Sequence, residues 1–144
     1  MSFNIAIDGP AGAGKSTIAK KIAKELGFVY VDTGAMYRAM ALYFLRSNIS
    51  NEDEQAISRA SENVEITIQY ENGEQQVFLN GENVSGEIRK EEVGNMASKT
   101  SGYGQVRKKL VELQQQLAKK ADVVMDGRDI GTVVLPDAQV KVYL

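Results

Sequence analysis

The chain contains no cysteine and no histidine. Without cysteine it can form neither a disulfide nor a thiolate nucleophile nor a Cys-type zinc site. Without histidine it has no Ser-His-Asp triad and none of the usual histidine metal ligands. Any chemistry must therefore depend on lysines, arginines, carboxylates, hydroxyls and backbone amides.

Long apolar runs and a strong excess of one charge are also missing. No run approaches the roughly 20 apolar residues that a membrane span needs, and the N-terminus lacks the features of a secretory signal. The formal net charge is −2, with no basic stripe of the kind that binding along a nucleic acid requires. We therefore expect a cytoplasmic protein without membrane or nucleic-acid partners, and any site for a polyanion must be local.

The order of apolar segments predicts an α/β fold. At 144 residues and 43% apolar composition the chain is long enough for one domain with a core. Apolar repeats every four positions predict a helix that ends at Gly27, and a second helix is expected from a cap at Thr33 through Met36, Met40 and Phe44. This alternation with strands implies a parallel β-sheet core with flanking helices. The short apolar runs typical of buried strands are residues 3–7, 28–31, 122–126 and 139–144.

The pattern changes near residue 63. Polar and apolar residues alternate there, and Asn72-Gly73 and Asn80-Gly81 predict turns, so a small antiparallel β insertion is expected. Two helical pieces follow between residues 90 and 121, broken at 101–104. The seven-residue spacing from Val106 to Leu117 allows a short coiled coil, but we expect packing against the sheet, because two heptads are too few. Residues 1–62 and 103–144 would form the core, and 63–102 the insertion.

One motif lies between the first predicted strand and the first predicted helix. It fits the pattern G-x-x-x-x-G-K-[ST], a phosphate-binding loop (P-loop). Glycines let backbone amides point inward, and the helix N-terminus adds its positive dipole end, so the alternative of a simple linking turn is disfavoured. A nucleoside triphosphate, ATP or a relative, is the expected ligand, with Lys15 on its phosphates and Ser16 on Mg²⁺. The loop residues are Gly9, Pro10, Ala11, Gly12, Ala13, Gly14, Lys15, Ser16 and Thr17.

Charged residues follow the other predicted strands. Asp126 ends an apolar run; alone it would fit a turn residue, but beside a P-loop it is a candidate second Mg²⁺ ligand. The sequence has no N-K-x-D segment, which would read guanine, and no L-S-G-G-Q signature of a transport ATPase. Among proteins with a P-loop, a small kinase therefore remains as the expected class. A kinase of phosphorylated acceptors needs arginines to offset repulsion between phosphates. Arg38 and Arg128, both shortly after strand ends, are the candidates.

Four segments together resemble the bacterial cytidylate kinase (CMP kinase) family, a group of nucleoside-monophosphate kinases. They are IAIDGPAGAGKST, VDTGAMYRA, LNGENVSGEIR and MDGRDIGTVVLPDA, and the resemblance covers essentially the whole chain. It implies transfer of the γ-phosphoryl group of ATP to CMP or dCMP, in a monomer, with residues 63–102 as the CMP-binding insertion. It also implies that Lys15, Arg38 and Arg128 are catalytic.

The resemblance carries further residues over by position. Thr33, Tyr37 and Arg38 would line the acceptor nucleotide, Arg128 would bind its phosphate beside Asp126, and the cytosine edge would be read by Ser98, Arg107 and Asp129. A carboxylate such as Asp129 can accept a hydrogen bond from the amino group of cytosine, which uracil lacks.

The resemblance stops short at the C-terminus. Members of the family continue through a lid helix and a last strand that we expect to be absent from this chain. Two hypotheses follow: the sequence represents part of a CMP kinase, or it is a nucleotide-binding fragment with little turnover because water is poorly excluded without the lid.

Overall fold

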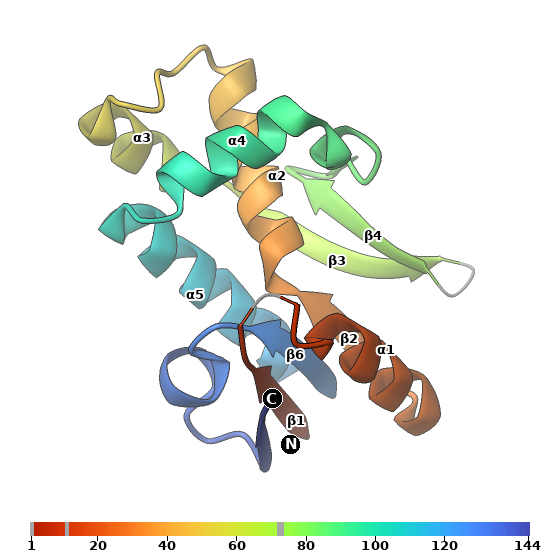
Figure 1. Cartoon of the computed structure of the whole chain (residues 1–144). Helices are drawn as coiled ribbons and strands as arrows, with labels where there is room; N and C mark the ends of the chain where they lie inside the picture. Colours follow the sequence, from red (N-terminus) through yellow and green to blue (C-terminus); the bar gives the residue numbers. More distant parts are fainter. Residues whose placement is uncertain (1, 11, 72–73) are drawn as a thin grey trace. The chain divides into compact units, whose positions relative to one another are not determined.

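The computed structural model (Figure 1) describes residues 2–10, 12–71 and 74–144. The chain divides into two compact units, residues 1–33 with 114–144, and residues 34–113. Both divisions fall within helices, α2 (Thr33–Arg46) and α5 (Gly104–Lys120).

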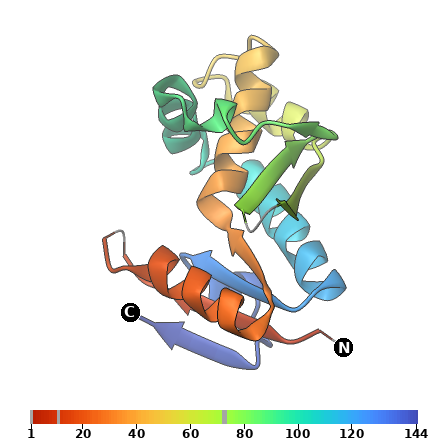
Figure 2. The ribbon, with the colours of Figure 1, turned by 90° about the vertical axis from the view of Figure 1, so that its right-hand side faces the viewer.

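The first unit is built on a parallel sheet of four strands in the order β2-β6-β1-β7. The strands are β1 (Asn4–Asp8), β2 (Val29–Asp32), β6 (Val123–Gly127) and β7 (Val140–Tyr143). Helix α1 (Lys15–Leu26) connects β1 to β2 and lies across one face of the sheet (Figure 2). It ends at Gly27, whose φ of 72° is left-handed, so the predicted parallel core and the predicted end of the helix are confirmed.

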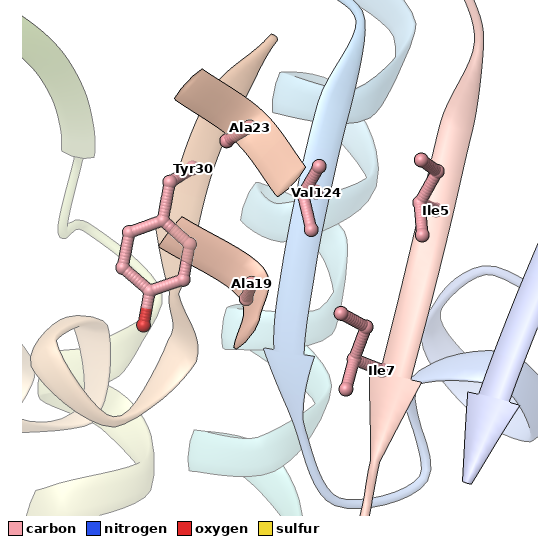
Figure 3. Close-up of a cluster of buried hydrophobic side chains, with 6 residues drawn as sticks. All are labelled: Ile5, Ile7, Ala19, Ala23, Tyr30 and Val124. Atoms are coloured by element: carbon pink, nitrogen blue, oxygen red, sulfur yellow. The ribbon is translucent and has the colours of Figure 1, made fainter. Parts of the chain in front are cut away.

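A row of apolar side chains across the sheet faces α1. The register places Tyr30 opposite Val124 and Val124 opposite Ile5, and two helical alanines, Ala19 and Ala23, are buried in the same cluster (Figure 3). Alanine is small, so α1 approaches the strands closely, and the alternation of side chains along β1 adds Ile7 to the same face. This cluster holds the start of α1, and therefore the preceding loop, against the sheet.

Strand β7 differs from the expectation of a buried strand over residues 139–144. Val140 is 40% and Tyr143 80% exposed. Within the described part of the chain β7 pairs only with β1 and forms an edge of the sheet, so its side chains have a neighbouring strand on one side alone. Position in the sheet, and not apolar composition, decides this burial.

The second unit combines helices with a small antiparallel sheet, as predicted. Strands β3 (Ile66–Glu71), β4 (Glu74–Leu79) and β5 (Glu82–Asn83) pair in that order, while the expected turn Asn72-Gly73 lies outside the described residues. In α2 the predicted apolar positions Met36, Met40 and Phe44 are fully buried. Helix α3 (Glu54–Ser61) precedes these strands, and the short turn η1 (Glu87–Arg89) and helix α4 (Glu91–Thr100) follow them.

The two helical pieces expected between residues 90 and 121 are α4 and α5, and the break lies between them as predicted. In α5 the residues Val106, Leu110 and Leu113 are buried. No helix among the described residues is both long and apolar enough to cross a membrane.

Candidate nucleotide-binding site

The glycine-rich loop joins β1 to α1 at the carboxyl edge of the parallel sheet. Gly12 and Gly14 have φ angles of 83° and 84°, which residues with a Cβ rarely adopt. Gly14 is the N-cap of α1, and in the described part of the chain no side chain caps this helix and no acidic residue occupies its first turn. The first amide groups of α1 are therefore left for an anionic ligand. Ala11 lies outside the described residues.

The polar side chains of the loop lie at the start of α1. Lys15 is the first helical residue, is half-buried, and its Nζ lies 3.4 Å from the carbonyl oxygen of Pro10. That bond is long, so it holds the ammonium only weakly. Ser16 and Thr17 are exposed. The loop thus presents an ammonium group, two hydroxyls and helix amides, which is the set of donors that phosphates require.

Asp126 lies on the sheet face that α1 covers. The register pairs it with Asp32 on one side and Ile7 on the other, and it is 5% exposed. The Tyr30 hydroxyl donates a 2.9 Å hydrogen bond to its Oδ2. The carboxylate is therefore held in one orientation, beside the end of the adjacent strand β2.

Burial raises the pKa of Asp126 to about 6. The hydrogen bond from Tyr30 opposes this rise, the negative charge of Asp32 adds to it, and the positive charges of Lys15 and Lys20 oppose it. At neutral pH the carboxylate is mostly ionised, but the positive groups of the protein balance its negative charge only in part. A cation bound beside it would complete the neutralisation.

The donor set suits magnesium held largely by a substrate. Ser16 and Asp126 provide one hydroxyl and one carboxylate, and no group of three or more acidic, His or Cys side chains that could hold a metal occurs among the described residues. Mg²⁺ binds oxygen and often uses only one or two protein ligands, with waters and phosphate oxygens as the others. The chemistry of these two residues therefore fits the expected ion.

Thr33 is placed differently from the expected helix cap. Helix α2 begins at Thr33 itself, and its hydroxyl donates to the carbonyl oxygen of Asp126 at 2.9 Å. The side chain is buried. It therefore joins the end of β2 to the end of β6.

Arg128 and Asp129 follow β6 directly. Both side chains are exposed, and Asp129 has a left-handed φ of 60°. No hydrogen bond or ion pair engages the Arg128 guanidinium within the described residues. The first unit thus places the loop, Asp126, Arg128 and Asp129 at the carboxyl ends of neighbouring strands of its sheet.

The remaining expected residues belong to the second unit. Arg38, on α2, donates from Nη1 to the carbonyl oxygen of Ile88 in η1 at 3.2 Å. A Cβ on Gly94 would lie 3.4 Å from Arg38 Nη2, so this glycine leaves room for the guanidinium beside α4. Ser98 lies four residues after Gly94, on the same face of α4. Arg38 and Ser98 therefore project from two neighbouring helices, α2 and α4. Half-buried Tyr37 and exposed Arg107 lie on α2 and α5.

Two contributors to the site were not identified from the sequence. Tyr30 was assigned only to a buried strand, yet its hydroxyl orients Asp126. Its position two residues before Asp32, on the same strand face, was the available signal. Gly94 lies inside a predicted helix, where glycine is unfavourable, and that cost was the signal for close approach of another group.

Comparison with known proteins agrees with this geometry. The sequence model of the family described as cytidylate kinase matches residues 5–144. A cytidylate kinase of Caldicellulosiruptor saccharolyticus is 54% identical over 99% of this chain and 63% of its own length. One from Caldanaerobacter subterraneus subsp. tengcongensis is 56% identical over 100% of this chain and 62% of its own, and one from Lactobacillus johnsonii 52% identical over 99% and 62%.

The chain therefore spans less than two thirds of the length of these curated relatives. The family model nevertheless covers nearly all of the chain, and the P-loop, the parallel sheet and the antiparallel insertion agree with it. On these grounds the chain belongs to the cytidylate kinase family.

Proposed function

We propose that the protein transfers the γ-phosphoryl group of ATP to CMP or dCMP, giving ADP and CDP or dCDP. The observation that carries the proposal is the pairing of two features at neighbouring strand ends, in a chain of this family: the glycine-rich loop with Lys15 after β1, and the buried Asp126 carboxylate on the adjacent strand β6. Such a pair binds a triphosphate with its magnesium ion. The proteins of similar sequence are named cytidylate kinases.

The donor side of the reaction is assigned to the first unit. The backbone N–H groups of the loop from Gly9 to Thr17, except at Pro10, which has none, and the Lys15 ammonium would hold the ATP phosphates. Ser16 and Asp126 would hold Mg²⁺. When bound, that ion neutralises charge on the phosphates. Lys15 would act as a point charge on the β- and γ-phosphates.

The acceptor side is assigned to the arginines and to the insertion, residues 63–102. Arg38 and Arg128 would hold the CMP phosphate with planar guanidinium groups. The contact of Arg38 with Ile88, and the space that Gly94 leaves, support a link between this arginine and the insertion. Thr33 and Tyr37 would line the acceptor, and Ser98, Arg107 and Asp129 would read the cytosine.

The reaction needs positioning more than proton transfer. An oxygen of the CMP phosphate is anionic near neutral pH, so no residue has to remove a proton from it. That oxygen forms a bond to the γ-phosphorus, the bond to the bridging oxygen breaks, and its electron pair leaves on ADP. Lys15, Arg38 and Arg128 would offset the charges that repel each other along this line.

Calorimetry and an ADP-release assay test the proposal. With ATP and Mg²⁺ present, CMP and dCMP should bind and be phosphorylated at least tenfold more efficiently than UMP or AMP. A preference for AMP, or failure to bind both ATP and CMP, would contradict it. Binding of CMP without turnover would favour the other hypothesis, a nucleotide-binding fragment.

A further inference from the structure

Asp8 has an unusual contact that the proposed site does not use. It is the last residue of β1 and immediately precedes the glycine-rich loop. Its Oδ1 accepts a 2.7 Å hydrogen bond from the backbone N–H of Ile130, and its Oδ2 accepts one of 2.9 Å from that of Gly131. One carboxylate thus binds two successive amides 122 and 123 residues away in the chain.

These two amides begin the short helical turn η2 (Ile130–Val134), which follows Arg128 and Asp129. Amides at the start of a helical turn have no partner within it. A carboxylate that accepts from both makes charge-assisted hydrogen bonds, which are stronger than neutral ones. Asp8 therefore fixes the backbone at the point where the loop after β6 ends.

The conformation of Asp129 needs such support. Its φ and ψ are 60° and 26°, in the left-handed region, which is uncommon for residues other than glycine, although Asp adopts it more readily than most. Backbone in this region persists where the surroundings determine it. The bonds of Asp8 to the next two residues supply that determination on the C-terminal side of Asp129.

Close packing at Gly131 shows that the carboxylate fits closely against this turn. A Cβ at Gly131 would lie 3.3 Å from Asp8 Oδ2 and 3.2 Å from Lys141 Cδ, both tight for carbon. The backbone of Asp8 is also held on two sides, opposite Gly127 in β6 and Tyr143 in β7. A rigid central strand therefore carries the group that anchors the turn.

We infer that Asp8 is a positioning residue for CMP: it holds the Arg128–Asp129 loop in the conformation that presents the guanidinium to the acceptor phosphate and the Asp129 carboxylate to the cytosine amino group. The inference rests on the proposed function. It adds a residue that touches neither nucleotide but determines how the acceptor is recognised.

The variant Asp8→Asn tests this role. The side-chain amide keeps one acceptor oxygen but replaces the other by a donor, so one backbone N–H loses its partner and both lose the charge. We expect the affinity for CMP to fall about 10- to 100-fold, the scale for losing hydrogen bonds to a charged group. The preference for CMP over UMP should fall too, whereas affinity for ATP should change less than about twofold, because the amides of α1 are not involved.

Asp122→Asn is the matched control. Its Oδ1 accepts from the backbone N–H of Phe3 at 2.7 Å, at the opposite end of the sheet, so the same chemical change is made away from the loop. This variant should keep the CMP affinity and the CMP preference of the unaltered protein.

Three outcomes would overturn the inference. Unchanged CMP affinity in Asp8→Asn would do so, as would an equal loss of ATP and CMP binding, which indicates a general structural role. If Asp8→Asn does not fold, amide hydrogen exchange in the unaltered protein decides instead. The backbone N–H groups of Ile130 and Gly131 should exchange slowly, and exchange as fast as that of solvent-exposed amides without a hydrogen bond would overturn the inference. Failure of the unaltered protein to bind CMP would instead refute the proposed function, while slow exchange at these two amides would still show the anchor.

Discussion

Replacing Asp126 by Asn tests the electrostatics of the site without any ligand. The pKa of Asp126 rises from 3.8 to about 6 in the folded chain, chiefly because the carboxylate is buried. A difference of about two units, at 1.36 kcal/mol each, corresponds to at most about 3 kcal/mol. Asn keeps the shape and an oxygen that can accept from Tyr30, but it carries no charge.

The sign follows from the direction of the shift. Because the folded pKa lies above the unfolded one, the unfolded chain releases this proton more readily, and ionisation favours unfolding. The penalty grows between about pH 4 and about pH 6 and is complete above that range. Asp126→Asn should therefore be more stable than the unaltered chain at about pH 8, by up to about 3 kcal/mol, with about half of this gain at pH 5 and little at pH 4.

Urea unfolding at these three pH values measures the effect. Asp137→Asn, at an exposed position of the same unit, removes one negative charge from the surface and should give no comparable pH-dependent gain. The reasoning would be refuted if the stability difference between Asp126→Asn and the unaltered chain stayed constant from pH 4 to pH 8. A constant offset would show that packing, and not ionisation, is what the substitution changes.

Two further substitutions test the loop and the join between β2 and β6. Lys15→Ala should lower ATP affinity about 10- to 100-fold, because it removes a charge-assisted phosphate contact. Calorimetry measures this loss against the control Lys24→Ala, at the exposed end of α1. Equal ATP affinities of the two variants would contradict the role of Lys15. Gly127→Ala should destabilise the chain by about 1–3 kcal/mol, because a Cβ there would overlap the Thr33 hydroxyl oxygen. Gly86→Ala, in open space with a right-handed φ of −76°, should have no such cost in the same urea experiment, and equal costs would refute the overlap.

Much of the arrangement could be predicted from local pattern. The glycine-rich loop turns between a strand and a helix because Gly12 and Gly14 can adopt the positive φ angles that the turn requires, and Gly27 ends α1 for the same reason. The change from helical to alternating periodicity near residue 63 identified the antiparallel sheet. These features depend on residues close together in the sequence.

Features that depend on distant partners could not be predicted in this way. The spacing of Tyr30 from Asp32 places both on one strand face, but it does not identify Asp126, 96 residues later, as the partner of the Tyr30 hydroxyl. Strand β7 has the apolar composition of an interior strand, yet among the described residues it pairs with β1 alone, and the order of strands in the sheet, not the local pattern, determines that. The Asp8 carboxylate likewise finds its amides through the adjacency of β1 and β6, which local pattern does not specify.

The central place of β1 has a consequence for synthesis of the chain. Phe3, just before the strand, and Asn4, its first residue, donate backbone hydrogen bonds to the side chains of Asp122 and Gln139, 119 and 135 residues later, so the strand has no partner in its sheet until β6 has been synthesised. At roughly 5–20 residues per second this wait lasts on the order of ten seconds. Pairings of such high contact order also form slowly. Until β6 has been made, the apolar side chains of β1 therefore lack the neighbouring strands that cover them in the folded sheet.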